Sequence, residues 1–200
     1  MIRILCADIA SADEHVYKSL YDRASAERKK RADRYLRPQD KLRCVTAEAL
    51  LRAALGTDAF RIQKNEFGKP SVIDHENFHY NLSHSGRYVV LAWGDAEVGV
   101  DVEEHCAKTD ITAIAKQCFA IDEQEYVGQS IRRFYEVWTG KESYLKYTGE
   151  GLRRDMRSFS IFGQEPKVRF LSCLPDGGYS LSLCTTDKKY TFALPDVRQL

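Results

Sequence analysis

The sequence lacks a long apolar run, a paired-cysteine motif and any large charge imbalance. Its 200 residues contain 30 Lys+Arg and 29 Asp+Glu, a net charge of +1, so no overall charge attracts nucleic acid. No apolar segment approaches the roughly 20 residues that span a bilayer, and Met1–Cys6 does not start a secretory signal. We therefore expect a cytoplasmic protein with neither nucleic acid nor membrane among its partners.

The six cysteines show no C-x-x-C or Cys/His spacing, which argues against a zinc module and against a secreted disulfide framework. The chain does contain enough apolar residues for a sizeable core, at 44% hydrophobic content. A chain of 200 residues permits one large domain or two small ones.

Segments of strand-like and helix-like periodicity follow one another along the chain. Alternation and turn signals predict strands over Ile2–Ile9, Phe60–Asn65, Phe78–Leu82, Arg87–Trp93, Val98–Glu104, Arg157–Phe162, Lys167–Leu171, Tyr179–Cys184 and Tyr190–Leu194. Helical spacing predicts helices over Ser25–Leu36, Pro38–Leu55, Thr109–Phe119, Asp122–Val127 and Ser130–Tyr147. This order favours an α+β fold made of two similar halves.

Two carboxylates share one face of the segment Val98–Glu104. Asp101 and Glu103 alternate with Val100 and Val102, so the valines point inward and the acids outward. At a separation of about 7 Å between their Cα atoms, both acids can reach one divalent cation, and they do not both stay ionised easily without a cation between them. A solvated strand edge is the alternative interpretation. Gly99 allows a close approach of backbone or ligand, or marks a bulge.

Side chains of the types that can bind phosphate occur in two other segments. The segment Asn81–Gly86, expected as a loop between strands, offers hydroxyls, an imidazole and backbone N–H groups, although an ordinary hairpin turn is the alternative. A Ser-His-Asp hydrolase fits poorly, because Ser83 directly precedes His84 and no G-x-S-x-G occurs. Arg28 and Arg31 lie on one side of a basic helix, where they either hold phosphates or form a solvated face.

The helix over Ser130–Tyr147 carries Trp138, Glu142 and Lys146 at four-residue intervals on one side. These residues form either an acid, base and anion-binding set or an ordinary surface ion pair. Gly140 within this helix costs about 1 kcal/mol relative to Ala, which indicates a close approach there or a locally weak helix.

Three segments taken together resemble the signature motifs of the 4′-phosphopantetheinyl transferases of the surfactin-activator (Sfp) type. They are Asn81–Ser85, Gly99–Glu103 and Trp138–Lys146. Ser25–Arg43 and Phe67–Pro70 resemble the same family. The resemblance implies two pseudo-symmetric α+β halves, each a small antiparallel sheet packed with helices. Residues 1–98 would bind the phosphates and nucleotide of coenzyme A, and residues 99–200 would carry the metal-binding acids and the catalytic helix.

The resemblance also implies an activity. Such an enzyme, a holo-[acyl-carrier-protein] synthase or 4′-phosphopantetheinyl transferase, is a monomer that uses coenzyme A and Mg²⁺. It moves 4′-phosphopantetheine to a serine of an apo acyl or peptidyl carrier protein and releases adenosine 3′,5′-bisphosphate. The alternatives are a non-catalytic binding module of the same fold and a metal-dependent phosphohydrolase.

The motif positions assign a role to each residue. The implied metal ligands are Asp101, Glu103 and Glu142. The implied coenzyme A ligands are Arg28, Arg31, Lys69, Ser83, His84, Lys141 and Lys146. The implied catalytic residues are Glu142, Lys146, Asp101 and Glu103. Glu142 would be the base, directly or through a metal-bound water, and Lys146 would stabilise or protonate the leaving phosphate.

Overall fold

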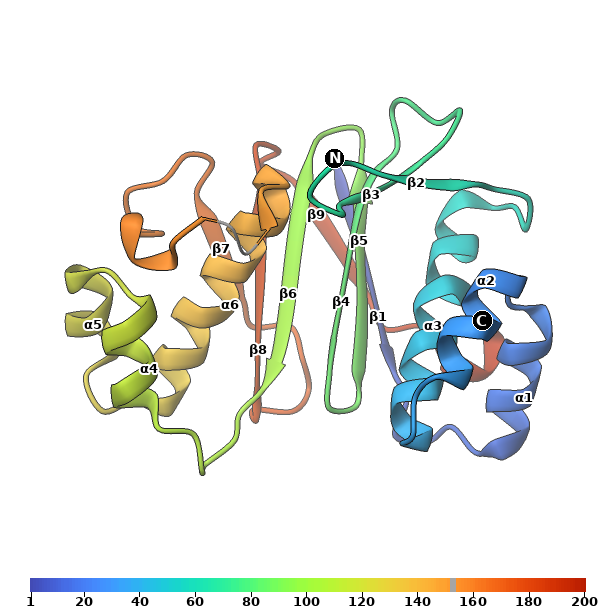
Figure 1. Cartoon of the computed structure of the whole chain (residues 1–200), viewed down its shortest axis with the longest axis horizontal. Coiled ribbons are helices and arrows are strands. Elements are labelled where there is room, and N and C mark those ends of the chain that lie inside the picture. The colour runs from blue at the N-terminus through green and yellow to red at the C-terminus, as the bar shows by residue number, and fades with distance from the viewer. Residues whose placement is uncertain (152–153) are drawn as a thin grey trace.

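A computed structural model describes residues 1–151 and 154–200 as two α+β halves that lie side by side (Figure 1). The first half contains a four-stranded sheet with the order β4 (His79–Ser85), β5 (Tyr88–Gly94), β1 (Ile2–Asp8) and β9 (Tyr190–Ala193). The second half contains an antiparallel sheet with the order β6 (Val98–Glu104), β8 (Tyr179–Thr185) and β7 (Val168–Leu171). The predicted α+β architecture of two similar halves is confirmed.

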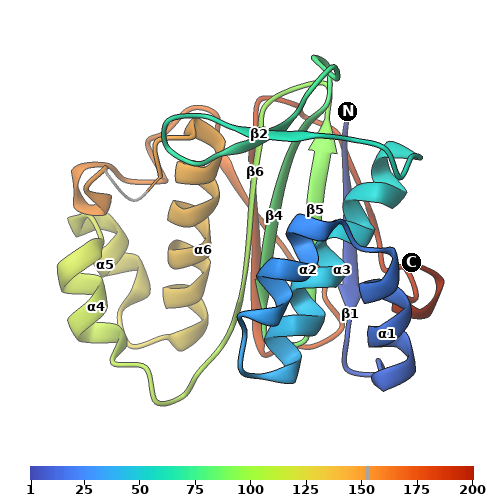
Figure 2. The ribbon, with the colours of Figure 1, turned by 45° about the vertical axis from the view of Figure 1, so that its right-hand side comes forward.

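The α-helices cover the outer faces of the two sheets (Figures 1 and 2). The first sheet is covered by α1 (Glu14–Arg23), α2 (Ala26–Asp33) and α3 (Pro38–Leu55). The second is covered by α4 (Ile111–Cys118), α5 (Ile121–Val127) and α6 (Ile131–Thr148). Short 3₁₀ turns occur at η2 (Met156–Ser158) and η3 (Val197–Gln199). No helix among the described residues has the length and apolar character needed to cross a membrane.

The two long helices begin and end where the sequence predicts. Pro38 occupies the first turn of α3, and Gly56 ends that helix with a φ of 68°. The Ser130 hydroxyl caps α6 by accepting the Arg133 N–H, and Gly149 ends the helix with a φ of 75°. Both glycines adopt the left-handed conformation, which side chains with a Cβ disfavour.

Three sequence predictions need correction. The segment Asn81–Gly86 is not a loop, because β4 continues to Ser85 and the chain turns at Gly86. The strand predicted over Arg157–Phe162 is absent, and η2 with a following turn stands in its place. Helix α1 was not predicted, although the Asp13 carboxylate caps it by accepting the Val16 N–H.

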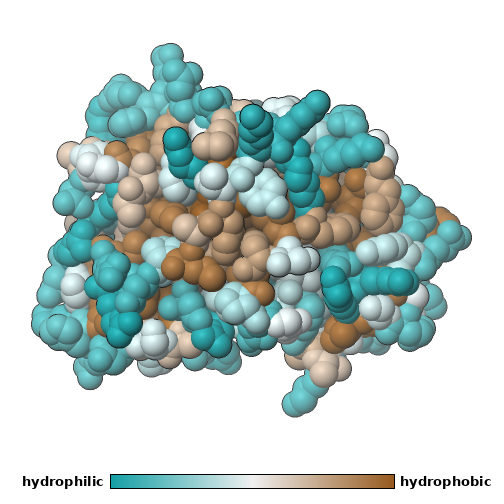
Figure 3. All heavy atoms as spheres, turned by 180° about the vertical axis from the view of Figure 1, so that it is seen from behind, coloured by the Kyte–Doolittle hydropathy of each residue, from teal (hydrophilic) through white to brown (hydrophobic). Residues whose placement is uncertain are grey.

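A central core joins the halves, because the two sheets face each other across it. Ile4 and Val90 of the first sheet and Val100 and Leu183 of the second are fully buried in one cluster. Each such side chain contributes about 1.5–3 kcal/mol through burial. Viewed from behind, apolar side chains gather in a band across the middle of the surface (Figure 3).

The end of the chain returns to the first half. Strand β9 pairs in parallel with β1, with Ile2 opposite Tyr190, and Val197 is buried in the core beneath α3. The segment after β8 therefore packs on residues that precede β6. The predicted division between residues 98 and 99 falls at the first residues of β6. Strand β9 follows this division in the sequence but belongs to the sheet of the first half.

The short strands β2 (Ile62–Lys64) and β3 (Pro70–Val72) form an arm that reaches from the first half to the C-terminal end of α6 (Figure 2). The turn between them contacts the last residues of that helix. Lys69 Nζ donates to the Tyr147 carbonyl at 2.9 Å, and the Asn65 amide donates to the Gly149 carbonyl at 3.5 Å. The arm therefore links the two halves at the end of α6.

Candidate active site

Side chains, not backbone pairs, connect strand β4 to strand β6. The Asn81 Oδ1, Ser83 Oγ and Ser85 Oγ atoms accept the backbone N–H groups of Val100, Val102 and Glu104, at 3.0, 3.3 and 3.1 Å. The three acceptors alternate along β4, as residues on one face of a strand do. We call this arrangement the seam, and it lies where the two halves meet.

The two predicted acids of β6 are held at the seam. The Ser83 hydroxyl donates to Asp101 Oδ1 at 2.7 Å, and the Ser85 hydroxyl donates to Glu103 Oε2 at 2.7 Å. The Asp101 carboxylate is buried, with 3% of the residue exposed. Ser83 therefore contacts an acidic residue in this structure, whereas the family resemblance implies that it binds a phosphate of coenzyme A.

Helix α6 adds a third acid and a lysine because Gly99 lets it lie directly on β6. A Cβ at Gly99 would overlap the Ser143 carbonyl oxygen and lie 2.5 Å from the Tyr147 nitrogen. The predicted close approach of backbone at Gly99 is confirmed. Lys146 Nζ reaches across to donate to Asp101 Oδ1 at 2.6 Å.

Gly140, within α6, has the same explanation as Gly99. A Cβ at Gly140 would lie 2.7 Å from Cδ1 of Ile161 and 3.3 Å from the ring of Phe170. Gly140 therefore marks a close approach of α6 to the segment after η2 and to β7, as one of the two sequence interpretations expected.

Electrostatics group the three acids into one environment. Burial raises the pKa of Glu142, and the neighbouring Asp101 raises it further while Lys146 opposes. Burial also raises the pKa of Glu103, with smaller contributions in the same direction from Asp101 and Glu142. The charge of Asp101 thus acts on both Glu103 and Glu142.

The donor set at the seam fits a hard cation such as Mg²⁺. Asp101 Oδ2 is buried and has no hydrogen-bond partner, which costs about 1–3 kcal/mol for such an acceptor. Carboxylate oxygens are the ligands that Mg²⁺ prefers. Within residues 1–151 and 154–200, however, no three His, Cys, Asp or Glu side chains already stand as a metal cluster. Lys146 instead neutralises Asp101.

A cationic groove of about 700 Å³ lies in the first half beside this site. Arg28, Arg31 and His84 line it, as the sequence prediction of a shared phosphate site requires. Burial lowers the pKa of His84, and the charges of Arg43, Lys146 and Arg31 lower it further. The groove therefore favours an anionic ligand. The phosphate-binding role of these residues stays a prediction.

The buried carboxylate of Glu48 orients Arg28 in the groove. Glu48 is 3% exposed and accepts from Arg28 Nε at 3.2 Å and from Arg52 Nη2 at 2.8 Å. Glu48 also accepts the N–H and the hydroxyl of Ser25, the residue that caps α2. The sequence prediction did not include Glu48.

Two predicted phosphate ligands lie elsewhere. Lys69 pairs with Glu97 at 2.6 Å, at the junction of the arm with α6, and is not among the residues lining the groove. Lys141 lies in the core of the second half, fully buried, with Nζ 2.7 Å from Glu123 Oε2. The structure does not bring Lys141 to the seam, because one residue along a helix turns a side chain by about 100°, away from the Glu142 side.

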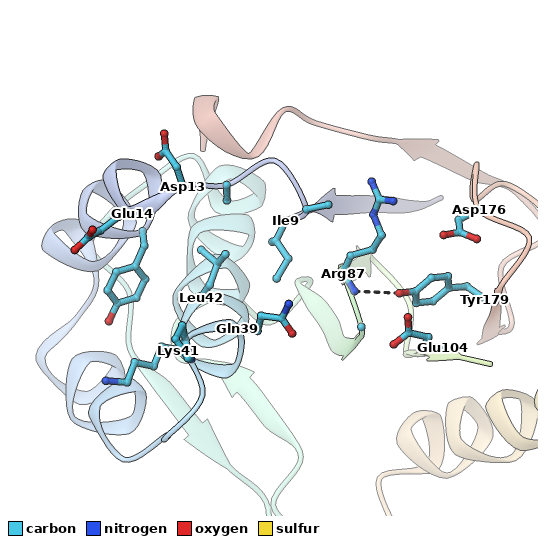
Figure 4. A pocket seen from close by; sticks show the side chains of 15 residues that line it. Ile9, Asp13, Glu14, Gln39, Lys41, Leu42, Arg87, Glu104, Asp176 and Tyr179 are labelled. Carbon is cyan, nitrogen blue, oxygen red and sulfur yellow. Dashed lines mark hydrogen bonds between the residues drawn. The ribbon is translucent and has the colours of Figure 1, made fainter. Parts of the chain in front are cut away.

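A second hollow, of about 940 Å³, opens at the Gly86 turn (Figure 4). Leu42 and Ile9 lie on one side of it, and Glu104 and Tyr179 on the other. The Tyr179 hydroxyl accepts the Arg87 N–H at 3.2 Å, which fixes the chain just after the seam. The sequence prediction did not find this hollow, because its residues come from five separate segments.

Comparisons with known proteins agree with the geometry. A family model described as the 4′-phosphopantetheinyl transferase superfamily matches residues 97–194, and one described as 4′-phosphopantetheinyl transferase, N-terminal, matches residues 11–95. The two matches divide the chain close to the start of β6.

Curated relatives carry the same description. The 4′-phosphopantetheinyl transferase gsp of Aneurinibacillus migulanus is 34% identical over 175 residues, which are 80% of this chain and 71% of the relative. Sfp of Bacillus subtilis (strain 168) is 30% identical over 148 residues, 68% of this chain and 65% of Sfp. Psf-1 of Bacillus pumilus is 36% identical over 147 residues, 68% of this chain and 62% of the relative.

The match thus covers less than two thirds of the length of Sfp and psf-1 and somewhat more of gsp. It includes both halves of this chain, and the three motif segments that resemble the family converge on the seam and α6. The chain therefore belongs to the 4′-phosphopantetheinyl transferase superfamily, as a transferase of the Sfp type.

Proposed function

We propose that this protein transfers 4′-phosphopantetheine from coenzyme A to a serine of an apo acyl or peptidyl carrier protein, with Mg²⁺ as cofactor. Adenosine 3′,5′-bisphosphate is the second product. The observation that carries the proposal is Asp101, a buried carboxylate with one unpartnered oxygen, beside both Lys146 and the cationic groove. The names of the relatives support the same reaction.

Coenzyme A would bind with its nucleotide phosphates in the groove. Arg28 and Arg31 offer guanidinium groups that suit phosphate oxygens, and Glu48 fixes the first of them. His84 connects the groove to the seam, because it follows Ser83 on β4. The diphosphate would then lie between this groove and α6.

The acids of the seam and of α6 would hold Mg²⁺. Asp101, Glu103 and Glu142 are the candidate ligands, and the cation would neutralise charge on the diphosphate. Lys146 must then exchange its contact with Asp101 for one with the phosphate. Its side chain is 28% exposed, so it has room to turn.

The remaining chemistry belongs to two residues of α6. The serine oxygen of the carrier attacks the phosphorus on the pantetheine side, and the bond from that phosphorus to the bridging oxygen breaks. Glu142, whose pKa is raised chiefly by burial, takes the serine proton. Lys146 donates to the leaving phosphate, whose negative charge grows as the bond breaks.

The proposal extends to the setting of the enzyme. It acts as a monomer in the cytoplasm, without nucleic-acid or membrane partners. Residues 1–98 supply the coenzyme A groove and residues 99–200 supply the acids and the catalytic helix. This division of roles is supported by the positions of Arg28, which lines the groove of the first half, and Glu142, which lies on α6 of the second half.

The test is to incubate the protein with coenzyme A, Mg²⁺ and several apo carrier proteins and to weigh each carrier by mass spectrometry. A carrier that gains one phosphopantetheine supports the proposal. Carriers that stay unmodified while coenzyme A is split indicate a phosphohydrolase, and carriers that are bound but unmodified indicate a binding module. The control is Asp101→Asn, which removes the charge at nearly unchanged size.

A further inference from the structure

Strand β4 ends in Ser85, a serine to which the motif positions assign no individual role. Ser85 lies two residues after Ser83, on the same face of β4, and both hydroxyls contact β6. The Ser85 oxygen is 3.1 Å from the Glu104 nitrogen and 2.7 Å from Glu103 Oε2. It is thus bonded at once to the backbone of β6 and to an acid on the same strand.

The direction of these two hydrogen bonds is fixed by chemistry. A backbone N–H can only donate, so the Ser85 oxygen is the acceptor from Glu104. A carboxylate can only accept, so the single hydroxyl hydrogen of Ser85 points to Glu103 Oε2. The serine therefore has one arrangement available, and it commits one defined oxygen of Glu103.

The Gly86 turn holds Ser85 in this place. A Cβ at Gly86 would overlap the Tyr179 hydroxyl and lie 2.6 Å from Glu104 Oε2, so only glycine fits there. Arg43 Nη1 donates to the Gly86 carbonyl at 2.5 Å. Figure 4 shows Tyr179 and Arg87 joined on the other side of the turn. The residue after Ser85 is thus fixed from both sides.

We propose that Ser85 is a positioning residue for the metal-binding acids: it holds the Glu103 carboxylate so that its other oxygen faces the cation. Ser83 does the same for Asp101, where the result is visible as the unpartnered Oδ2. Groups that hydrogen-bond to metal ligands set their orientation, and their loss weakens metal binding. The proposal rests on the proposed function, because it assumes that these acids bind Mg²⁺.

A direct role for Ser85 on phosphate is the competing explanation. Its hydroxyl hydrogen already goes to Glu103, so it has no second hydrogen to donate to a phosphate oxygen. Ser85 is also absent from the lining of the cationic groove, which includes its neighbour His84. Both observations favour the positioning role.

The experiment measures Mg²⁺ affinity by calorimetry on protein saturated with coenzyme A, without any carrier. Ser85→Ala is expected to weaken Mg²⁺ binding about 10- to 100-fold, the usual effect of losing the partner of a metal ligand. Coenzyme A affinity without Mg²⁺ is expected to stay unchanged. Ser85→Thr keeps the hydroxyl and is expected to restore Mg²⁺ binding.

The matched control is Ser182→Ala on β8, in the sheet that carries Glu103; the Ser182 hydroxyl lies 2.7 Å from Thr139 Oγ1. It is expected to leave Mg²⁺ affinity unchanged. Wild-type Mg²⁺ affinity in Ser85→Ala, or a loss of coenzyme A affinity without Mg²⁺, would overturn the proposal.

Ser85→Cys covers the case in which the alanine variant does not fold. A thiol is a weaker donor of similar size, so Mg²⁺ affinity must fall between those of wild type and alanine. Unchanged affinity in Ser85→Cys would also overturn the proposal. Because no carrier is present, these results are independent of whether the wild-type protein transfers phosphopantetheine.

Discussion

Within the motif Trp138–Lys146, Lys141 is the residue at which a structural role and a catalytic role predict the most different results. Its ammonium lies 2.7 Å from Glu123 Oε2 and donates to the carbonyl oxygens of Met156 and Phe159, at 2.7 and 2.6 Å. Both charged side chains are fully buried. Burial lowers the pKa of Lys141 and raises that of Glu123, and each partner opposes the effect of burial on the other.

The perturbation is Lys141→Met, which keeps the length of the chain and removes the charge. Removing one partner of a buried ion pair destabilises a protein by about 3–5 kcal/mol, because the other charge stays buried alone. At about 2–4 °C per kcal/mol for a chain of this size, the melting temperature should fall by roughly 6–20 °C. Two backbone carbonyls also lose their donor.

The assay is urea unfolding together with scanning calorimetry, and coenzyme A binding measured where the variant is folded. Adding Glu123→Gln should recover part of the lost stability, since the amide removes the lone charge and its one oxygen still accepts either the Ala120 or the Ile161 N–H group. A Lys141→Met protein of wild-type stability that binds coenzyme A poorly would refute this reasoning, because that result places Lys141 on the diphosphate.

Three further changes have distinct expected outcomes. Gly99→Ala forces α6 away from β6 and should destabilise the fold by about 1–3 kcal/mol in urea unfolding, while Gly177→Ala, with open space around it, should not. Asp101→Asn should lower the rate of transfer by at least about 100-fold and leave the circular dichroism spectrum unchanged, since only the charge is lost; a transfer rate near that of wild type contradicts the role given to Asp101. His84 is the pH-dependent case: its folded pKa is depressed, so the unfolded chain protonates first and stability is lost as pH falls below about 6.5. His84→Gln should remove that part of the loss in unfolding scans at pH 7.5 and 5.5, and an unchanged difference would contradict it.

The sequence predicts the fold class because its periodic segments are long and well bounded. Helix α3 follows from Pro38, an apolar stripe and Gly56, all of them local signals. Helix α1 could have been found in the same way, because Asp13 precedes it and Val16 and Leu20 are four residues apart.

The errors have long-range causes. The polar segment Asn81–Ser85 has weak strand propensity, but it is extended because its backbone pairs with β5, while its side chains replace backbone acceptors for β6. The alternation of Asn81, Ser83 and Ser85 was the only local sign of this strand. The segment predicted as the strand Arg157–Phe162 curls because Lys141, distant in sequence, takes the carbonyls of Met156 and Phe159.

The positions of site residues were predictable where a polar side chain lies on the polar face of its strand or helix. Lys146 donates to Asp101 and the charge of Asp101 raises the pKa of Glu142, because strand and helix periodicity fix which way these side chains face; their shared role stays a prediction. The buried position of Lys141 was not predicted, because lysine is almost never fully buried and no local signal reveals Glu123 as its partner.

The most direct measurement is a crystal structure of the protein with coenzyme A and Mg²⁺. We expect a cation about 2.0–2.1 Å from carboxylate oxygens of Asp101, Glu103 and Glu142, including the Asp101 Oδ2 that now has no partner. Lys146 should have left Asp101 for a phosphate oxygen. A diphosphate bound away from the seam, with the pair of Asp101 and Lys146 intact, would contradict the proposed mechanism.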